Sequence, residues 1–215
     1  METSENKSVK GILESAESLF STKGYDGTSI RDVVKMAKVN LAAVNYHFGN
    51  KESLYCEILR RRLRSINQRR LEKLGSAIEV AGDNPIPLTL IIDILARPLF
   101  EPGNNTKEKN GRSSRLIGRS TVEPLPFTQE LLATELHLIT SHFSRAIRKH
   151  VINLQPAEFM WRLNFVIGAM HHTLATLHQM TTLTRGLCQN DDYEGALRHF
   201  TQFAVDTFTT PPRRS

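Results

Sequence analysis

Residues 29–51, SIRDVVKMAKVNLAAVNYHFGNK, are the stretch that decides the fold. Ser29 and Asp32 have the spacing of a capping box, so we expect a helix to start there. Asn40 is a good N-cap for a second helix of barely two turns, which ends at Gly49. The stretch therefore predicts two short helices joined by a tight turn.

Apolar residues at helical spacing flank this stretch on both sides. They predict one helix before it, ending at Lys23-Gly24, and one long helix after Asn50. The apolar positions are Val9, Ile12, Leu13, Ala16, Leu19 and Phe20 before it, and Leu54, Ile58, Leu63 and Ile66 after it. An earlier helix bracing two short ones is the unit that lays its last helix in the major groove of DNA.

The second short helix has suitable residues for such a groove. If Val44 and Phe48 face the core, then Leu41, Ala42 and Asn45 face outward. Asn can pair with adenine through two hydrogen bonds, and Leu or Ala can touch a thymine methyl group. By spacing alone, a three-helix core without any DNA role stays open.

The remainder of the chain is also helical in pattern, and no alternating strand run is present. We expect helices over 88–96, 126–151, from Pro156 onward and over 193–208, with a loop over 101–114 and a loop-rich stretch over 98–126. The predicted fold is all-α. An N-terminal three-helix helix-turn-helix domain over 1–55, with its recognition unit at about 29–50, precedes a larger helical domain over 56–215.

The net charge of +6 is concentrated near the N-terminus, because residues 1–75 hold 14 Lys and Arg against 9 Asp and Glu. This excess indicates phosphates or an anionic surface as a partner. Six arginines contribute to it, and they could equally be a solvated helix face: Arg60, Arg61, Arg62, Arg64, Arg69 and Arg70. No apolar run is long enough for a membrane span, and residues 1–10 lack an apolar signal region, so we expect a cytoplasmic protein.

Motifs of catalysis and metal binding are not found in the sequence. It has no glycine-rich phosphate loop, no nucleophile elbow and no His-Glu-x-x-His, so we expect neither an enzyme nor a bound cofactor. The later histidines lack companion ligands, and we expect no metal: His137, His142, His171, His172 and His178. Cys56 and Cys188 are interpreted as packing residues. A protein that coats DNA or a membrane surface without sequence preference stays open as an alternative.

The runs 24–34 and 39–54 resemble the DNA-binding domain of the TetR family, over about the first 60 residues. The resemblance implies that Arg31 reaches DNA and that Leu41, Ala42 and Asn45 read base edges. It also implies four phosphate contacts, by Ser29, Tyr46, His47 and Lys51. Lys38 is a departure, because the family usually has Gly at that place in the turn.

The resemblance further implies a ligand-responsive transcriptional regulator, by default a repressor, which binds a palindromic operator as a homodimer. In the family the last two helices form the dimer, and here they fall near 156–182 and 191–208. A small hydrophobic or amphipathic effector is expected to bind the C-terminal domain and release the operator. The candidate effector contacts are Phe100, Phe127, His137, Phe143, Trp161, Phe165 and His172.

Overall fold

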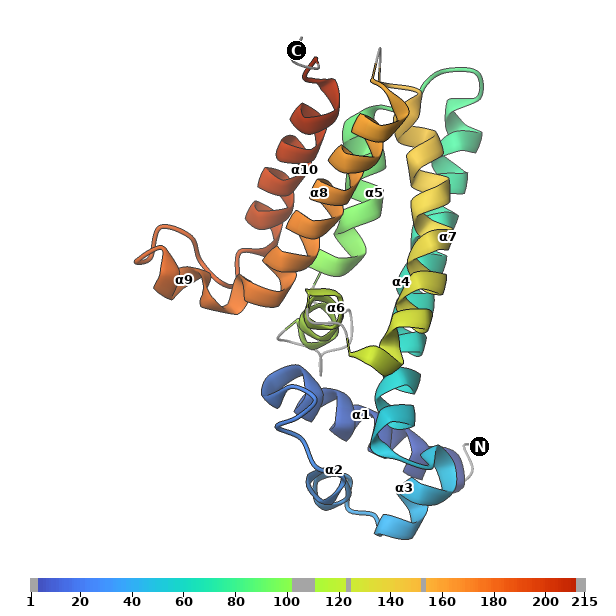
Figure 1. Ribbon diagram of the computed structural model, residues 1–215, viewed down its shortest axis with the longest axis vertical. Coiled ribbons are helices and arrows are strands. Elements are labelled where there is room, and N and C mark those ends of the chain that lie inside the picture. Colours follow the sequence, from blue (N-terminus) through green and yellow to red (C-terminus); the bar gives the residue numbers. More distant parts are fainter. Residues whose placement is uncertain (1–3, 102–110, 123–124, 152–153, 212–215) are drawn as a thin grey trace.

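The computed structural model describes residues 4–101, 111–122, 125–151 and 154–211, and every regular element in these ranges is a helix (Figure 1). The all-α prediction is therefore confirmed. The N-terminal helices are α1 (Ser4–Lys23), α2 (Ile30–Ala37), α3 (Leu41–Phe48) and α4 (Lys51–Ala81). The later ones are α5 (Leu88–Phe100), α6 (Arg112–Val122), η1 (Pro126–Thr128), α7 (Gln129–Arg148), α8 (Pro156–Thr176), η2 (Leu177–Gln179), α9 (Met180–Leu183) and α10 (Tyr193–Thr209).

The N-terminal unit has its own hydrophobic core. Helices α1, α2 and α3 and the start of α4 enclose it, and Phe20, Val33 and Val44 are almost completely buried there. This core continues along α4 to Leu59, four residues past the expected boundary at residue 55, and it also takes Leu116 from α6. One continuous helix, α4, thus belongs to both parts of the molecule.

A second, larger core is formed by the rest of α4 with α5, α7, α8 and α10, which run alongside one another (Figure 1). Two ring contacts show how distant parts of the chain meet in it. Phe100 of α5 stacks on Phe200 of α10, and Phe159 of α8 lies against Phe208 of α10, with ring centroids 5.8 and 5.7 Å apart. The C-terminal helix is therefore an integral part of this bundle.

The expectation of a loop-rich stretch over 98–126 is wrong for most of the residues that the structure describes there. Helix α5 continues through Pro98 to Phe100, because Pro98 lies in the last turn and removes only one helical hydrogen bond, while Leu99 and Phe100 are buried. Residues 112–122 form α6, although the predicted loop included its first turn. The remaining part of that predicted loop, 102–110, lies outside the described residues.

Helix α6 was not predicted because little in its own sequence, RSSRLIGRSTV, marks a buried helix. Its buried side is made of small residues, Ser114, Gly118 and Ser120, beside Leu116 and Ile117. Small residues let helix backbones approach closely. A Cβ atom on Gly118 would lie 2.7 Å from the Ala175 nitrogen and 2.8 Å from the His171 carbonyl oxygen, so α6 packs directly on the backbone of α8.

This close approach predicts opposite effects for two alanine substitutions. Gly118→Ala should lower the free energy of unfolding by about 1–3 kcal/mol, because two backbones must separate to accommodate the methyl group. Gly75→Ala is the control, since no atom lies within 4 Å of the added Cβ on α4. It should raise stability by about 0.5–1 kcal/mol. Urea denaturation measures both, and equal effects would contradict the proposed packing.

The buried His171 makes stability depend on pH. Burial, with a smaller contribution from the nearby Arg70 charge, lowers the pKa of His171 from 6.5 to about 4. Between these two values the unfolded chain binds a proton that the folded chain does not bind. Folding stability contributed by this group is therefore complete above pH 6.5 and falls as the pH decreases toward 4.

As the pH is lowered from 6.5 to 4, we expect His171 to reduce the unfolding free energy of the wild type by up to about 1.4 kcal/mol per pH unit. His171→Gln and His171→Leu, neither of which titrates, should both lose this component. Urea denaturation of the three proteins at pH 7.5 and pH 5 gives the comparison. Parallel pH profiles for wild type and variants would show that His171 is not the source.

Candidate nucleic-acid interface

Helices α2 and α3 begin where the sequence pattern predicted. The Ser29 hydroxyl accepts a hydrogen bond from the Asp32 backbone nitrogen at 3.1 Å, and the Asp32 carboxylate accepts one from the Ser29 nitrogen at 3.1 Å. The Asn40 side chain likewise accepts from the Ala43 nitrogen at 2.8 Å. Two hydrogen bonds from Ser29 to the Asp32 carboxylate lower the pKa of Asp32. The bond from the hydroxyl contributes most, followed by the bond from the backbone N–H.

The turn between α2 and α3 contains the residue that departs from the family pattern. Lys38 adopts the left-handed conformation, with φ of 56° and ψ of 42°, which glycine tolerates better than lysine. Its backbone N–H still caps α2 by donating to the Val34 carbonyl. The turn therefore keeps the helix-ending geometry despite the lysine, at some cost in backbone strain.

Helix α3 presents the predicted surface to solvent. Val44 is fully buried and Phe48 packs against the N-terminal core, as expected. On the other side, Leu41 is 48% exposed, and Ala42 and Asn45 are also exposed. The outward orientation of these three side chains is confirmed, and their contact with DNA stays a prediction.

The side chains expected to contact phosphates lie around the same helix. Tyr46 is 80% exposed and its ring lies edge-on to that of His47, which is half-buried. Arg31 is exposed on α2. Lys51, at the start of α4, is half-buried, and its ammonium group lies 4.0 Å from the centroid of the Tyr25 ring. The Ser29 hydroxyl donates to the Asp32 carboxylate at 2.8 Å, so its single hydrogen is already used within the chain.

Four arginines of the run on α4 are paired with carboxylates, whereas Arg69 is exposed. Glu57 accepts hydrogen bonds from both Arg60, at 2.7 Å, and Arg61, at 2.6 Å. Hydrogen bonding to these arginines lowers the pKa of Glu57 against the opposing effect of burial, which is the largest single influence. Arg62 pairs with Glu17 of α1 through two hydrogen bonds, and Arg64 pairs with Glu135 of α7.

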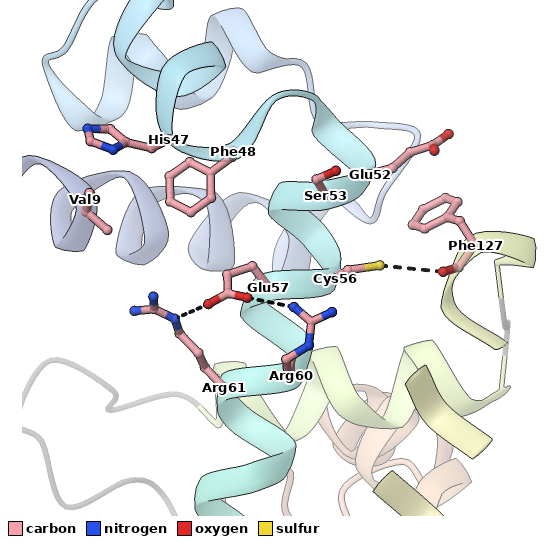
Figure 2. Close-up of a pocket in the computed structure, with 10 residues that line it drawn as sticks. All are labelled: Val9, His47, Phe48, Glu52, Ser53, Cys56, Glu57, Arg60, Arg61 and Phe127. Carbon is pink, nitrogen blue, oxygen red and sulfur yellow. Dashed lines mark hydrogen bonds and ion pairs between the residues drawn. The ribbon is translucent and has the colours of Figure 1, made fainter. Parts of the chain in front are cut away.

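A groove of about 600 Å³ lies between these arginines and α3. Figure 2 shows His47 and Phe48 on one side of it, with the Glu57, Arg60 and Arg61 cluster on the other. Cys56 also lines it, and its thiol contacts the Phe127 carbonyl oxygen at 3.6 Å. Burial is the main reason why the pKa of Cys56 is raised.

The residues expected to contact an effector are not brought together in one cavity. Phe100 and Phe143 are buried in the larger core, while Phe127 packs beside Tyr25 and lines the groove near α3. The other four are exposed, in two cases strongly: Trp161 at 62% and Phe165 at 57%, together with His137 and His172. The effector site expected from sequence is therefore not supported as a single set of residues, since helix packing turned most of them away from the interior.

Two polar residues that the sequence analysis did not select as site residues are buried in the larger core. Arg70 and His171 are each only 2% exposed. The helical spacing in the sequence indicates that both side chains are buried. Arg70 stands four residues after Ile66 and four before Leu74, and His171 stands three before Leu174, so each occupies a position where the buried face calls for an apolar residue.

No helix in the described ranges is long and apolar enough to cross a membrane. Among the same residues, no group of three or more His, Cys, Asp or Glu side chains is arranged to hold a metal ion.

Comparisons with known proteins agree on the family. Residues 12–58 match the family described as "Bacterial regulatory proteins, tetR family", and residues 93–206 match "Tetracyclin repressor-like, C-terminal domain". The second match covers more than half of the chain. Both halves of the molecule therefore point to the same group of proteins.

Individual relatives match more narrowly. The HTH-type transcriptional regulator YttP of Bacillus subtilis (strain 168) is 35% identical over 85 residues, which is 40% of this chain and 41% of YttP. IcaR of Staphylococcus epidermidis, a negative transcriptional regulator of the biofilm operon icaADBC, is 46% identical over 44 residues, 20% of this chain and 24% of IcaR. The chain thus spans less than half the length of either relative.

Among solved structures, a transcriptional regulator from Saccharomonospora viridis in complex with choline has a similar fold. Its TM-score is 0.58 at 21% identity, over 90% of this chain and 95% of that one. At this identity the likeness concerns the fold alone. The helix-turn-helix geometry and the two family matches together show that this chain belongs to the TetR family of bacterial DNA-binding transcriptional regulators, which are not enzymes.

Proposed function

We propose that this protein represses transcription by binding a palindromic operator as a homodimer, and that a small molecule bound among its C-terminal helices releases it. The observation that carries the DNA-binding part is the outer face of α3, where Leu41, Ala42 and Asn45 are exposed beside buried Val44. That face has both kinds of group that read a major groove, an amide and apolar side chains. The proposed place of action is the cytoplasm, where bacterial DNA lies.

The proposed DNA contacts divide into two classes. Leu41, Ala42 and Asn45 read base edges, while Tyr46, His47 and Lys51 hold phosphates on either side. Arg31 approaches from α2. Ser29 can join them when its hydroxyl leaves the Asp32 carboxylate, because a hydroxyl donates only one hydrogen.

The dimer is proposed to form through α8 and α10. Their exposed side includes Met160 (50%), Trp161 (62%) and Phe165 (57%) on α8, and Phe203 (47%) on α10. Trp161 and Phe165 stack with ring centroids 5.9 Å apart. Gly168 lies on the same helix, with no atom within 4 Å of a Cβ placed on it, so a second copy can approach closely there. Large exposed apolar groups on one face are typical of an interface between subunits.

Such a dimer would place two copies of α3 at a fixed separation. Successive major grooves on one side of DNA are one helical turn apart, roughly 34–36 Å. A two-fold dimer therefore fits a palindromic operator. The effector is proposed to favour a dimer in which this separation no longer matches.

Helix α6 supports the proposed route from effector to DNA. It packs on the backbone of α8 at Gly118, and it reaches α1 where the Ser113 hydroxyl donates to the Glu17 carboxylate at 2.8 Å. A cavity of about 190 Å³ lies among α6, α8 and the start of α10. The similar fold from S. viridis holds choline, which supports ligand binding by this kind of fold. A ligand that displaces α6 would thus displace α1.

Footprinting on DNA selected from a random pool tests the proposal as a whole. A short protected palindrome supports the operator-binding regulator. If the protein instead protects all DNA sequences equally, the result would favour the alternative function, in which it coats DNA without sequence preference.

Substitutions on α3 and α4 should separate base reading from phosphate binding. Asn45→Ala is expected to weaken binding to the selected operator by about 1–3 kcal/mol, with little effect on random DNA. Lys51→Ala should weaken both alike and reduce the slope of log K against log salt by about 0.9. Fluorescence anisotropy at several salt concentrations measures these effects. Lys73→Ala, exposed on α4 away from α3, is the control. If Asn45→Ala lowers the affinity for random DNA equally, the assignment of base reading to Asn45 is wrong.

The apolar face of α8 generates a prediction about assembly. Trp161→Glu and Phe165→Glu should each weaken dimerisation by at least about 2 kcal/mol, or roughly 30-fold, because they place a charge in the proposed interface. Sedimentation at micromolar concentration should show a wild-type dimer and monomeric variants. Val80→Glu is the matched control, since Val80 is 89% exposed at the far end of α4. A wild-type monomer would overturn the proposed dimer.

A further inference from the structure

Arg70 and His171 are buried polar side chains with nitrogen atoms that find no hydrogen-bond partner in the described part of the chain. These atoms are Nη2 of Arg70 and Nδ1 of His171. Arg70 extends from α4 and His171 from α8, into the same core. Buried polar groups are nearly always paired, so two unpaired nitrogen atoms in one core call for a physical explanation.

The guanidinium of Arg70 is fixed in place by neutral groups. Its Nε donates to the Leu95 carbonyl oxygen at 2.7 Å, and its Nη1 donates to the Asn67 side-chain oxygen at 3.2 Å. Asn67 in turn donates to the Glu135 carbonyl oxygen at 3.0 Å. Among the described residues no carboxylate pairs with Arg70. A buried charge without a counter-ion is strongly unfavourable, so this site is preorganised for an anion.

His171 lies within the electrostatic reach of this guanidinium. The charge of Arg70 contributes, after burial, to the lowered pKa of His171. Burial similarly lowers the pKa of Arg70 to about 9, with a smaller effect from Arg69. Burial and the neighbouring positive charges both disfavour a positive charge on these side chains. A bound anion would instead favour it.

Two hollows are lined by residues that lie about one helical turn along the chain from Arg70 and from His171. The smaller, of about 40 Å³, is lined by Ile66, four residues before Arg70, and by Pro98, three residues after Leu95. The larger, of about 190 Å³, is lined by Leu174, three residues after His171. Ser114 of α6 lines both hollows, so both lie beside α6.

The charges around the smaller hollow are mostly positive. Arg62, Arg69 and Arg112 line the smaller one together with Glu101. In the larger one Arg115 is matched by Asp191, and burial lowers the pKa of His178, which also lines it. The larger core around them is apolar, and it includes Ile66, Leu95, Met170 and Leu174. A ligand with one anionic end and an apolar body fits this distribution.

We propose that Arg70 and His171 form the anion-binding end of the effector site, and that the effector is an apolar carboxylate. One carboxylate oxygen accepts from Nη2 of Arg70, and the other accepts from Nδ1 of His171 in the tautomer that carries its hydrogen there. The apolar body lies along the hollows beside α6. This inference rests on the proposed function, since it specifies the effector of the same switch.

The test compares carboxylates with neutral amides of the same shape. Octanoate and benzoate are titrated into the full-length protein, with octanamide and benzamide as matched probes, by calorimetry and by thermal unfolding. At least one carboxylate should bind 10-fold or more tightly than its amide and raise the Tm. Equal binding of acid and amide, or binding by no carboxylate at millimolar concentration, would overturn the proposal and favour a buried water at these nitrogen atoms.

Substitutions then assign the preference to these residues. Arg70→Met should abolish the preference for the carboxylate, and His171→Gln should reduce it, whereas Lys73→Met keeps it. Lys73 is a suitable control because it is exposed on the same helix and the change removes the same charge. Arg70→Lys serves if Arg70→Met does not fold, and it should retain weakened binding. A carboxylate preference that persists in folded Arg70→Met, or that is undiminished in Arg70→Lys, would exclude Arg70 as the anion-binding group.

Operator binding, measured in the same samples, separates the two hypotheses. If the wild type binds its selected operator but shows no carboxylate preference, the inference about Arg70 and His171 fails and the regulator stands. If carboxylates bind and no specific operator is found, the proposed function fails instead.

Discussion

The direct packing of α6 on the backbone of α8 is the constraint on which the rest of the structure depends. Gly118 permits it, because any side chain there would meet the Ala175 nitrogen and the His171 carbonyl. Helix α6 also gives Leu116 to the N-terminal core and a hydrogen bond from Ser113 to Glu17. The same short helix is thus shared by both cores, so its position fixes how the DNA-binding unit sits against the bundle.

Two arginines of α4 join this helix to other helices through ion pairs. Arg62 links α4 to α1 through Glu17, and Arg64 links it to α7 through Glu135. The Glu17 carboxylate is largely buried and holds three helices together through Arg62 and Ser113. Removing one partner of such a pair would leave a buried charge, which costs far more than losing an exposed ion pair.

Much of the N-terminal unit could be predicted from sequence, because its signals are local. The capping residues Ser29 and Asn40 satisfy backbone N–H groups within three residues along the chain, so they mark helix starts wherever they occur. The burial of Val44 and the exposure of Leu41 and Asn45 follow from one helical period. The family resemblance rests on the same short stretch.

The sequence by itself determined the all-α class, the helix-turn-helix and the outward face of α3, because caps and helical periodicity act over a few residues. Only the tertiary structure decided which residues far apart in the chain meet, and which side chains are buried or exposed. It turned Trp161 and Phe165 outward, buried Arg70 and His171 together, and made a helix of 112–122 whose small residues are buried only because α8 lies against them. Contacts between distant helices depend on how whole faces pack, and no local pattern specifies which faces meet.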